Sequence, residues 1–103
     1  MPAPPIDEWT NQVQSRMDNY GFTDSQRQTA TTILTSCTTR ARAHLDSVKS
    51  DIDNANNMTD EAAKARTLRS LTKEVDKLYG ELTGRIESVA TIEQRQKTAT
   101  SQN

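Results

Sequence analysis

The chain has 103 residues, of which 13 are Lys or Arg and 14 are Asp or Glu, so its formal net charge is -1. This balance argues against nucleic acid as the main partner, because phosphate binding requires a clear basic excess. No apolar run approaches the roughly 18 residues of a membrane span, so we expect no membrane insertion. The length predicts one helical domain over residues 1–103, and an apolar fraction of 32% favours an elongated shape over a sphere.

The first ordered element is predicted to be a short helix over residues 6–20. Residues 1–5 contain three prolines and are expected to be disordered, as is the polar tail 98–103. After them, apolar residues recur at steps of three and four, and Gly21 stands where a helix commonly ends. The stripe consists of Ile6, Trp9, Val13, Met17 and Tyr20.

A second, longer helix is predicted over residues 24–56. Thr23 and Gln26 have the spacing of a capping box, in which each side chain binds the backbone N–H of the other residue. Cys37 is the single cysteine, so an internal disulfide is impossible. Because it lies on the apolar stripe, we expect it to be a small buried hydrophobe. The stripe comprises Ala30, Ile33, Leu34, Cys37, Ala41, His44, Leu45, Val48, Ile52 and Ala55.

A third helix is predicted over residues 60–89, after an Asn-rich turn at 54–57. Thr59 can cap this helix, and acidic residues follow it in the first turn. Gly80 and Gly84 inside the helix indicate either a close contact with the first helix or a soft spot. The apolar positions alternate between steps of three and four, which is typical of a coiled-coil seam. They are Leu68, Leu71, Val75, Leu78, Leu82, Ile86 and Val89.

The two apolar stripes define the register of an antiparallel helical hairpin. Facing residues in such a hairpin have a constant sum of residue numbers, and the pairs Ala41 with Val75 and Ala30 with Ile86 share one sum. The same register brings Thr23 close to Thr91. The fold is therefore predicted to be all-α, with a long hairpin that turns near Met58.

A second capping motif, Thr91 with Gln94, repeats the first one. It precedes a short C-terminal helix expected over residues 92–97. Because the register places both motifs at the open base of the hairpin, we expect them to fix that base.

The hairpin seam does not accommodate every apolar residue, so we expect a second chain to cover the remainder. This reasoning predicts a homodimer. The residues left over are Trp9, Met17, Ile33, His44 and Tyr79.

Catalytic chemistry is not expected. His44 is the single histidine, so one chain cannot form a histidine metal cluster or a catalytic triad, although a site shared between two chains stays open. We predict no catalytic residues, no cofactor and no metal ligands, and no enzymatic activity.

Seven basic residues form the candidate surface for a client or partner protein. Their alternative interpretation is a solvated face with scattered ion pairs. They are Arg27, Arg40, Arg42, Lys49, Arg66, Arg69 and Lys73.

The two capping motifs resemble those of a known family. Phe-Thr-Asp-Ser-Gln-Arg at 22–27 and Ala-Thr-Ile-Glu-Gln-Arg at 90–95 are similar to the twin Leu-Thr-x-x-Gln motifs of the Spy and CpxP group of small bacterial periplasmic proteins. Phe22 and Ala90 stand where the family favours Leu. The motif residues are Phe22, Thr23, Gln26, Thr91 and Gln94.

The resemblance implies an all-helical, curved, antiparallel dimer that acts as an ATP-independent chaperone or envelope-stress protein. It implies a periplasmic location, although no apolar signal-peptide core follows Met1, and a cytosolic location stays open. The alternative is an antiparallel coiled-coil module for one protein partner. A metal-resistance-associated protein is a weaker alternative. The metal-sensing relatives depend on several His and Met ligands, whereas this chain has His44 as its single histidine.

Overall fold

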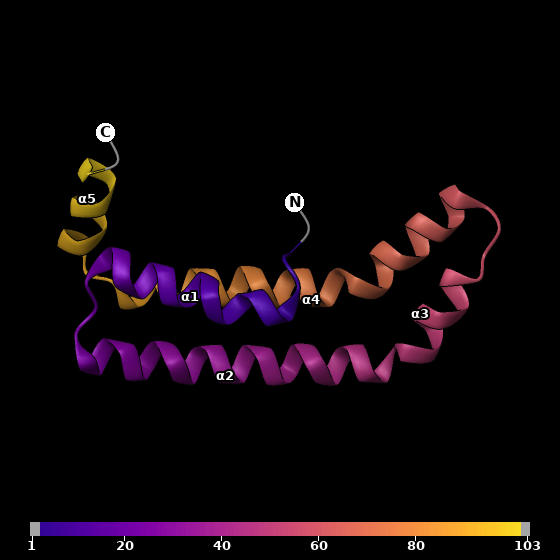
Figure 1. Ribbon diagram of the computed structural model, residues 1–103, viewed down its shortest axis with the longest axis horizontal. Coiled ribbons are helices and arrows are strands. Elements are labelled where there is room, and N and C mark those ends of the chain that lie inside the picture. The colour runs from indigo at the N-terminus through magenta and orange to yellow at the C-terminus, as the bar shows by residue number, and fades with distance from the viewer. Residues whose placement is uncertain (1–2, 102–103) are drawn as a thin grey trace.

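The computed structural model describes residues 3–101, with side chains through Lys97, and shows an all-α fold (Figure 1). No strand occurs in the described range, which confirms the predicted fold class. The molecule is elongated, at 51 × 29 × 17 Å. No described helix is long and apolar enough to cross a membrane. The helices are α1 (Ile6–Tyr20), α2 (Asp24–Ser47), α3 (Lys49–Asn56), α4 (Glu61–Val89) and α5 (Ile92–Ser101).

Helix α1 has the predicted bounds, and Gly21 ends it in the left-handed conformation, with φ 66° and ψ 46°. The Phe22 N–H donates to the Met17 carbonyl (3.0 Å), and the Gly21 N–H donates to the Asp18 carbonyl (3.2 Å). This is a Schellman motif, which glycine accommodates without a Cβ clash. The chain therefore reverses sharply between α1 and α2.

The predicted continuous helix over 24–56 is interrupted at Val48, which has φ -109° and ψ 12°. The Ser47 hydroxyl donates to the His44 carbonyl (2.6 Å) at this point, whereas similar bonds from Thr31 and Thr32 leave α2 uninterrupted. The Ile52 N–H still donates to the Val48 carbonyl (2.9 Å). The apolar stripe continues through the bend, so periodicity alone could not reveal it.

Helix α4 is capped by Asp60 rather than by Thr59. The Asp60 carboxylate accepts hydrogen bonds from the Ala62 N–H (3.0 Å) and the Ala63 N–H (3.3 Å). A carboxylate there also interacts favourably with the positive end of the helix dipole. Within α4, a Cβ added at Gly80 or Gly84 would meet nothing within 4 Å, so these glycines do not mark a close helix contact.

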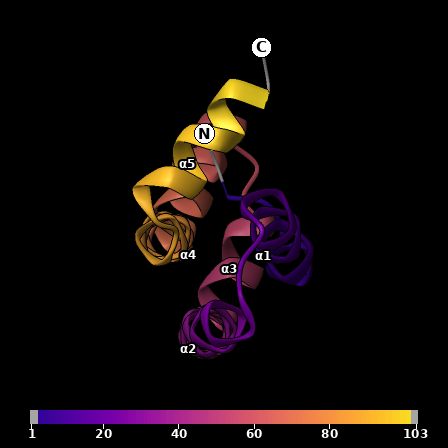
Figure 2. The ribbon, with the colours of Figure 1, turned by 90° about the vertical axis from the view of Figure 1, so that its left-hand side faces the viewer.

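Helices α1, α2 and α4 form a three-helix bundle, seen end-on in Figure 2. The Trp9 side chain is fully buried, and its ring lies 5.4 Å from that of Tyr79. The His44 Nε2 lies 2.8 Å from the Leu71 carbonyl oxygen, close to the predicted register. The buried core consists of Trp9, Val13, Met17, Phe22, Ala30, Ile33, Leu34, Cys37, Ala41, Val75, Leu78, Leu82, Ile86 and Ala90.

Most of the residues that led us to expect a second chain are packed within the bundle of a single chain. Trp9, Met17 and Ile33 are at most 7% exposed, and Tyr79 packs against the core. This part of the molecule therefore has no uncovered apolar flank among its described residues that would require a second chain.

Beyond the first residues of α1 the hairpin has only two helices. We call α3 and residues 61–72 of α4 the distal arm, which curves away from the axis of α2 (Figure 1). Ala55 is buried there, but Ile52, Leu68 and Leu71 are only half-buried. The distal arm thus lies outside the main core.

The ends of the chain differ in part from expectation. The Ala3 N–H donates to Asp76 Oδ1 (3.0 Å), and Trp9 Nε1 donates to the Pro4 carbonyl (2.9 Å). Residues 3–5 are therefore held against the bundle. Helix α5 extends past the expected end at 97. The disorder expected at residues 1–2 and 102–103 lies outside the described residues.

Candidate functional site

Two capping boxes meet at the base of the hairpin. Thr23 Oγ1 accepts from the Gln26 N–H (3.2 Å), and Gln26 Oε1 accepts from the Thr23 N–H (2.9 Å). Thr91 and Gln94 repeat this arrangement at 3.1 and 2.8 Å. Both boxes satisfy backbone donors that the first helical turn would leave unpaired. The structure thus brings together the residues of both predicted capping boxes.

The two glutamines bind each other directly. Gln26 Nε2 donates to Gln94 Oε1 (2.9 Å), and Gln94 Nε2 donates to Gln26 Oε1 (3.0 Å). Gln26 Nε2 also donates to the Val89 carbonyl (3.0 Å), and Gln94 Nε2 donates to the Gly21 carbonyl (3.3 Å). In each motif that carbonyl lies two residues before the capping threonine. We call this locally two-fold arrangement of Thr23, Gln26, Thr91 and Gln94 the glutamine clasp.

Phe22 and Ala90 occupy equivalent positions before the two capping threonines. Both are buried, and the Phe22 ring stacks on that of Tyr20 with centroids 5.9 Å apart. In contrast, Ile92 at the start of α5 is 66% exposed. Ala90 therefore packs into the base although it is smaller than Phe22.

Glu87 ties α1 to α4 next to the clasp. Its carboxylate pairs with Arg16 and accepts a hydrogen bond from the Tyr20 hydroxyl. Burial, followed by the hydrogen bond to Glu87 and the charge of Glu87, raises the pKa of Tyr20. Glu87 was not predicted as a site residue, because its partners lie far away in the chain.

Cys37 is fully buried in the core. Burial, together with the nearby Glu81 carboxylate, raises the pKa of its thiol. Because the thiolate is the reactive form, this environment supports the interpretation of Cys37 as a small packing residue.

Three of the seven candidate basic residues are held in ion pairs on the bundle. Arg27 pairs with Asp18 (3.1 Å), Arg40 with Glu81 (2.7 Å) and Arg42 with Asp7 (3.2 Å). Each pair joins two helices. The charge of each of these arginines is therefore paired with a carboxylate of another helix.

The other four basic residues belong to the distal arm and the adjoining turn of α4. Lys49 is exposed at the start of α3. Arg66, Arg69 and Lys73 line a shallow hollow of about 500 Å³ together with Ser70 and Asp76. None of the four forms an ion pair with another described residue. They are the free cations of the candidate surface.

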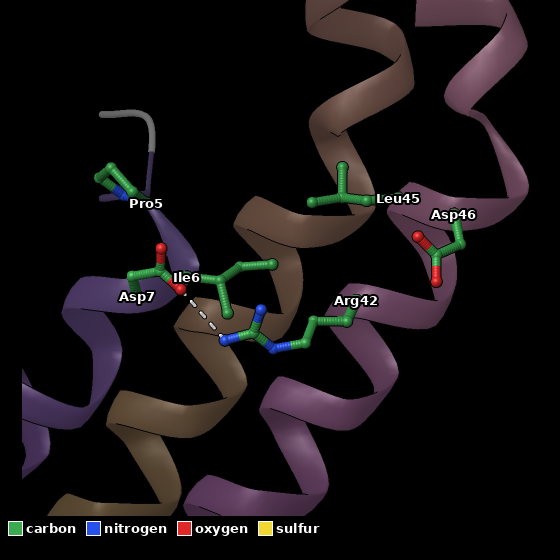
Figure 3. Close-up of a pocket in the computed structure, with 6 residues that line it drawn as sticks. All are labelled: Pro5, Ile6, Asp7, Arg42, Leu45 and Asp46. Carbon is green, nitrogen blue, oxygen red and sulfur yellow. Dashed lines mark hydrogen bonds and ion pairs between the residues drawn. The ribbon is translucent and has the colours of Figure 1, made fainter.

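A second hollow lies where α1 begins, and Figure 3 shows its lining. It has a volume of about 560 Å³ and lies between Pro5, Ile6 and Asp7 of the N-terminal segment and Arg42, Leu45 and Asp46 of α2. The hollow was not predicted, because its two walls are distant in sequence. The shortness of the first helix relative to the hairpin is the sequence signal that could have revealed it.

The part of the chain that the structure describes contains no candidate metal-binding cluster. No group of three or more His, Cys, Asp or Glu residues is placed to hold an ion there.

No family model matches the chain, and no curated protein or solved structure shows significant similarity to it. The likeness to the Spy and CpxP group therefore rests on the two motifs alone.

Proposed function

We propose that the chain is a non-enzymatic protein-binding module that acts, like the group it resembles, as an ATP-independent chaperone or envelope-stress protein. It would hold unfolded or partner proteins on the distal arm. The periplasmic location implied by the resemblance is part of this proposal.

The observation that carries the proposal is the incomplete cover of the hairpin. Ile52, Leu68 and Leu71 are half-buried, whereas the apolar residues beneath α1 are buried. Lys49 is three positions before Ile52 and Arg69 follows Leu68 in the sequence, and neither cation forms an ion pair with another described residue. A mixed apolar and basic surface of this kind supports protein binding, because apolar area supplies affinity and charge speeds encounter.

The direct test is suppression of the aggregation of a thermally unfolding model client, followed by light scattering. We expect protection by the chain, and loss of most of it in Leu68→Glu, which places a carboxylate on the distal arm. Gln14→Glu adds the same group on the exposed side of α1 and should protect normally. Absence of protection at several-fold molar excess would exclude the chaperone activity.

The alternative is a module that docks one specific protein. The packing of α1 on the hairpin favours this alternative, because the hairpin there holds one ordered helix through specific ion pairs. Saturable binding of one partner at fixed stoichiometry, without protection of unrelated clients, would support the alternative.

A further inference from the structure

We propose that the distal arm binds an amphipathic helix of a partner protein, with acidic side chains along the flank that faces α4. The binding surface, here called the distal face, comprises Lys49, Ile52, Leu68 and Arg69 of the distal arm and Leu45 near the end of α2. This inference rests on the proposed protein-binding function and names the class of segment that is bound.

Helix α1 shows how the same hairpin holds a helix. Trp9, Val13 and Met17 form a stripe at four-residue steps that is buried against α2 and α4. On the α4 side, Arg16 and Tyr20 bind Glu87. The hairpin face thus accepts a helix through an apolar stripe and charged flanks, which is the helix-in-groove mode of recognition.

Helix α1 stops before the hairpin does. The hollow lined by Pro5, Ile6, Arg42 and Leu45 opens at its first residue (Figure 3). Beyond that point the apolar positions of the seam continue on α3 and α4, where Ile52, Leu68 and Leu71 are only half-buried. An incoming helix would therefore continue along the surface that α1 leaves uncovered.

The charge along the edge of α4 determines which charge the facing flank of the incoming helix should carry. Arg69 lies about five helical turns before Glu87, so the two residues project from the same side of α4. Near α1 this side is acidic, with Asp76 binding the Ala3 N–H and Glu87 binding Arg16. On the distal arm it becomes basic at Arg69.

This change of charge also bears on the choice of occupant. The α1 helix of a second copy, in the orientation that α1 has here, would place its Arg16 flank against Arg69. Like charges there disfavour association. A partner helix with Asp or Glu on that flank would instead pair with Arg69 and its neighbours Arg66 and Lys73, none of which has an ion pair with another described residue.

The test uses two fluorescently labelled synthetic peptides of the length of α1, which is 15 residues. Both carry leucines at alternating three- and four-residue steps, and their flanks carry Glu in one and Lys in the other. Fluorescence anisotropy with the full chain should show about tenfold tighter binding of the Glu peptide, since two or more ion pairs change sign between the peptides. The bound Glu peptide should also gain helical circular dichroism.

A charge swap provides the decisive comparison. In the double variant Lys49→Glu, Arg69→Glu, the preference should reverse, so that the Lys peptide binds more tightly. The matched control, Arg85→Glu with Lys97→Glu, makes the same change in charge at exposed sites outside the distal face and should keep the original preference. All four substitutions replace exposed side chains, and a thermal melt checks that each variant is folded.

The contrary outcomes are distinct. Equal binding of both peptides, or a preference that the swap leaves unchanged, would overturn the helix proposal. If client protection persists in that case, the proposed function stands; if protection is absent as well, both fail. A stable dimer that Leu68→Glu dissociates would show that a second copy occupies the distal face, and would also overturn the proposal.

Discussion

Gln26 and Gln94 each use every hydrogen-bonding position of a side-chain amide. In both residues Oε1 accepts from a capping-threonine N–H and from the other glutamine, while Nε2 donates to the other glutamine and to a backbone carbonyl. An amide offers two donors and two acceptor sites, so the pair is fully satisfied. The geometry links the start of α2 to the start of α5 through two side chains.

Because the two glutamines bind each other, we expect their substitutions to have non-additive effects on the free energy of unfolding. Gln26→Ala and Gln94→Ala should each lower the free energy of unfolding by about 1–3 kcal/mol, because each leaves donors and acceptors of the other residue unpaired. The double variant should lose less than the sum of the two, by roughly 0.5–3 kcal/mol. Urea unfolding measures all three values, with Gln14→Ala on the exposed side of α1 as the control. Strict additivity would show that the glutamines act independently.

Tyr20 predicts a loss of stability at alkaline pH. Its pKa is raised above the ordinary 10.0 by burial and by Glu87, so the folded state favours the neutral phenol. The stabilisation from this group is fully present below pH 10.0 and is lost as pH rises through the folded pKa. Tyr20→Phe should lack this component of the loss when urea midpoints are compared from pH 8 to 11. Tyr79→Phe is the matched removal of a phenol hydroxyl, and an identical alkaline profile for Tyr20→Phe and wild type would contradict the prediction.

At the scale of elements, the helices differ in how they are held. Helices α1, α2 and α4 bury the core between them, whereas α3 contacts α4 largely outside that core. The bend at Val48 separates α2, which packs in the core, from α3, which packs outside it. Regions with few buried apolar contacts open more readily than a core does.

We therefore expect amide hydrogens of α3 and the first turns of α4 to exchange faster than those of residues 75–86, by about tenfold or more. Hydrogen exchange followed by mass spectrometry or NMR measures this difference. Uniform protection along α4 would mean that the distal arm and the bundle unfold as one unit.

Alanine substitutions at Gly84 in α4 and at Gly21 in the turn should change the stability of the protein in opposite directions. Gly84 is exposed, and an added Cβ meets nothing within 4 Å, so Gly84→Ala should stabilise the protein by about 0.5–1 kcal/mol. Gly21 has φ 66°, and Gly21→Ala should destabilise it by about 1–2 kcal/mol, because a Cβ is strained in that conformation. Thermal melts of both variants test the pair. Destabilisation by Gly84→Ala would indicate that α4 needs flexibility at this point.

At the scale of the whole molecule, one chain closes its own core. The described large apolar side chains are buried or half-buried except Ile92, which is 66% exposed. Half-buried apolar residues outside the main core, Ile52, Leu68 and Leu71, lie on the distal arm. The size of this surface follows from geometry, because α1 is about half as long as α4.

A closed core predicts a monomer at micromolar concentration, measurable by sedimentation or light scattering. Trp9 and Ile33 are buried within one chain, so the homodimer implied by the family resemblance would draw its apolar contact from the distal arm or Ile92. A dimer mass that Gln14→Glu leaves unchanged and Leu68→Glu halves would contradict the monomer and locate its contact.

The sequence by itself determined the all-α fold, the two capping boxes and the register of the hairpin. These features depend on neighbours within a few residues or on a repeating apolar pattern, as at Thr23 with Gln26 or in the seam of α4. The tertiary structure decided what depends on residues far apart in the chain. It paired Gln26 with Gln94, bound Arg16 and Tyr20 to Glu87, and ended the cover by α1 at Ile6. It also placed the bend at Val48, where the periodicity is uninterrupted and a single hydroxyl bond accompanies the change of direction.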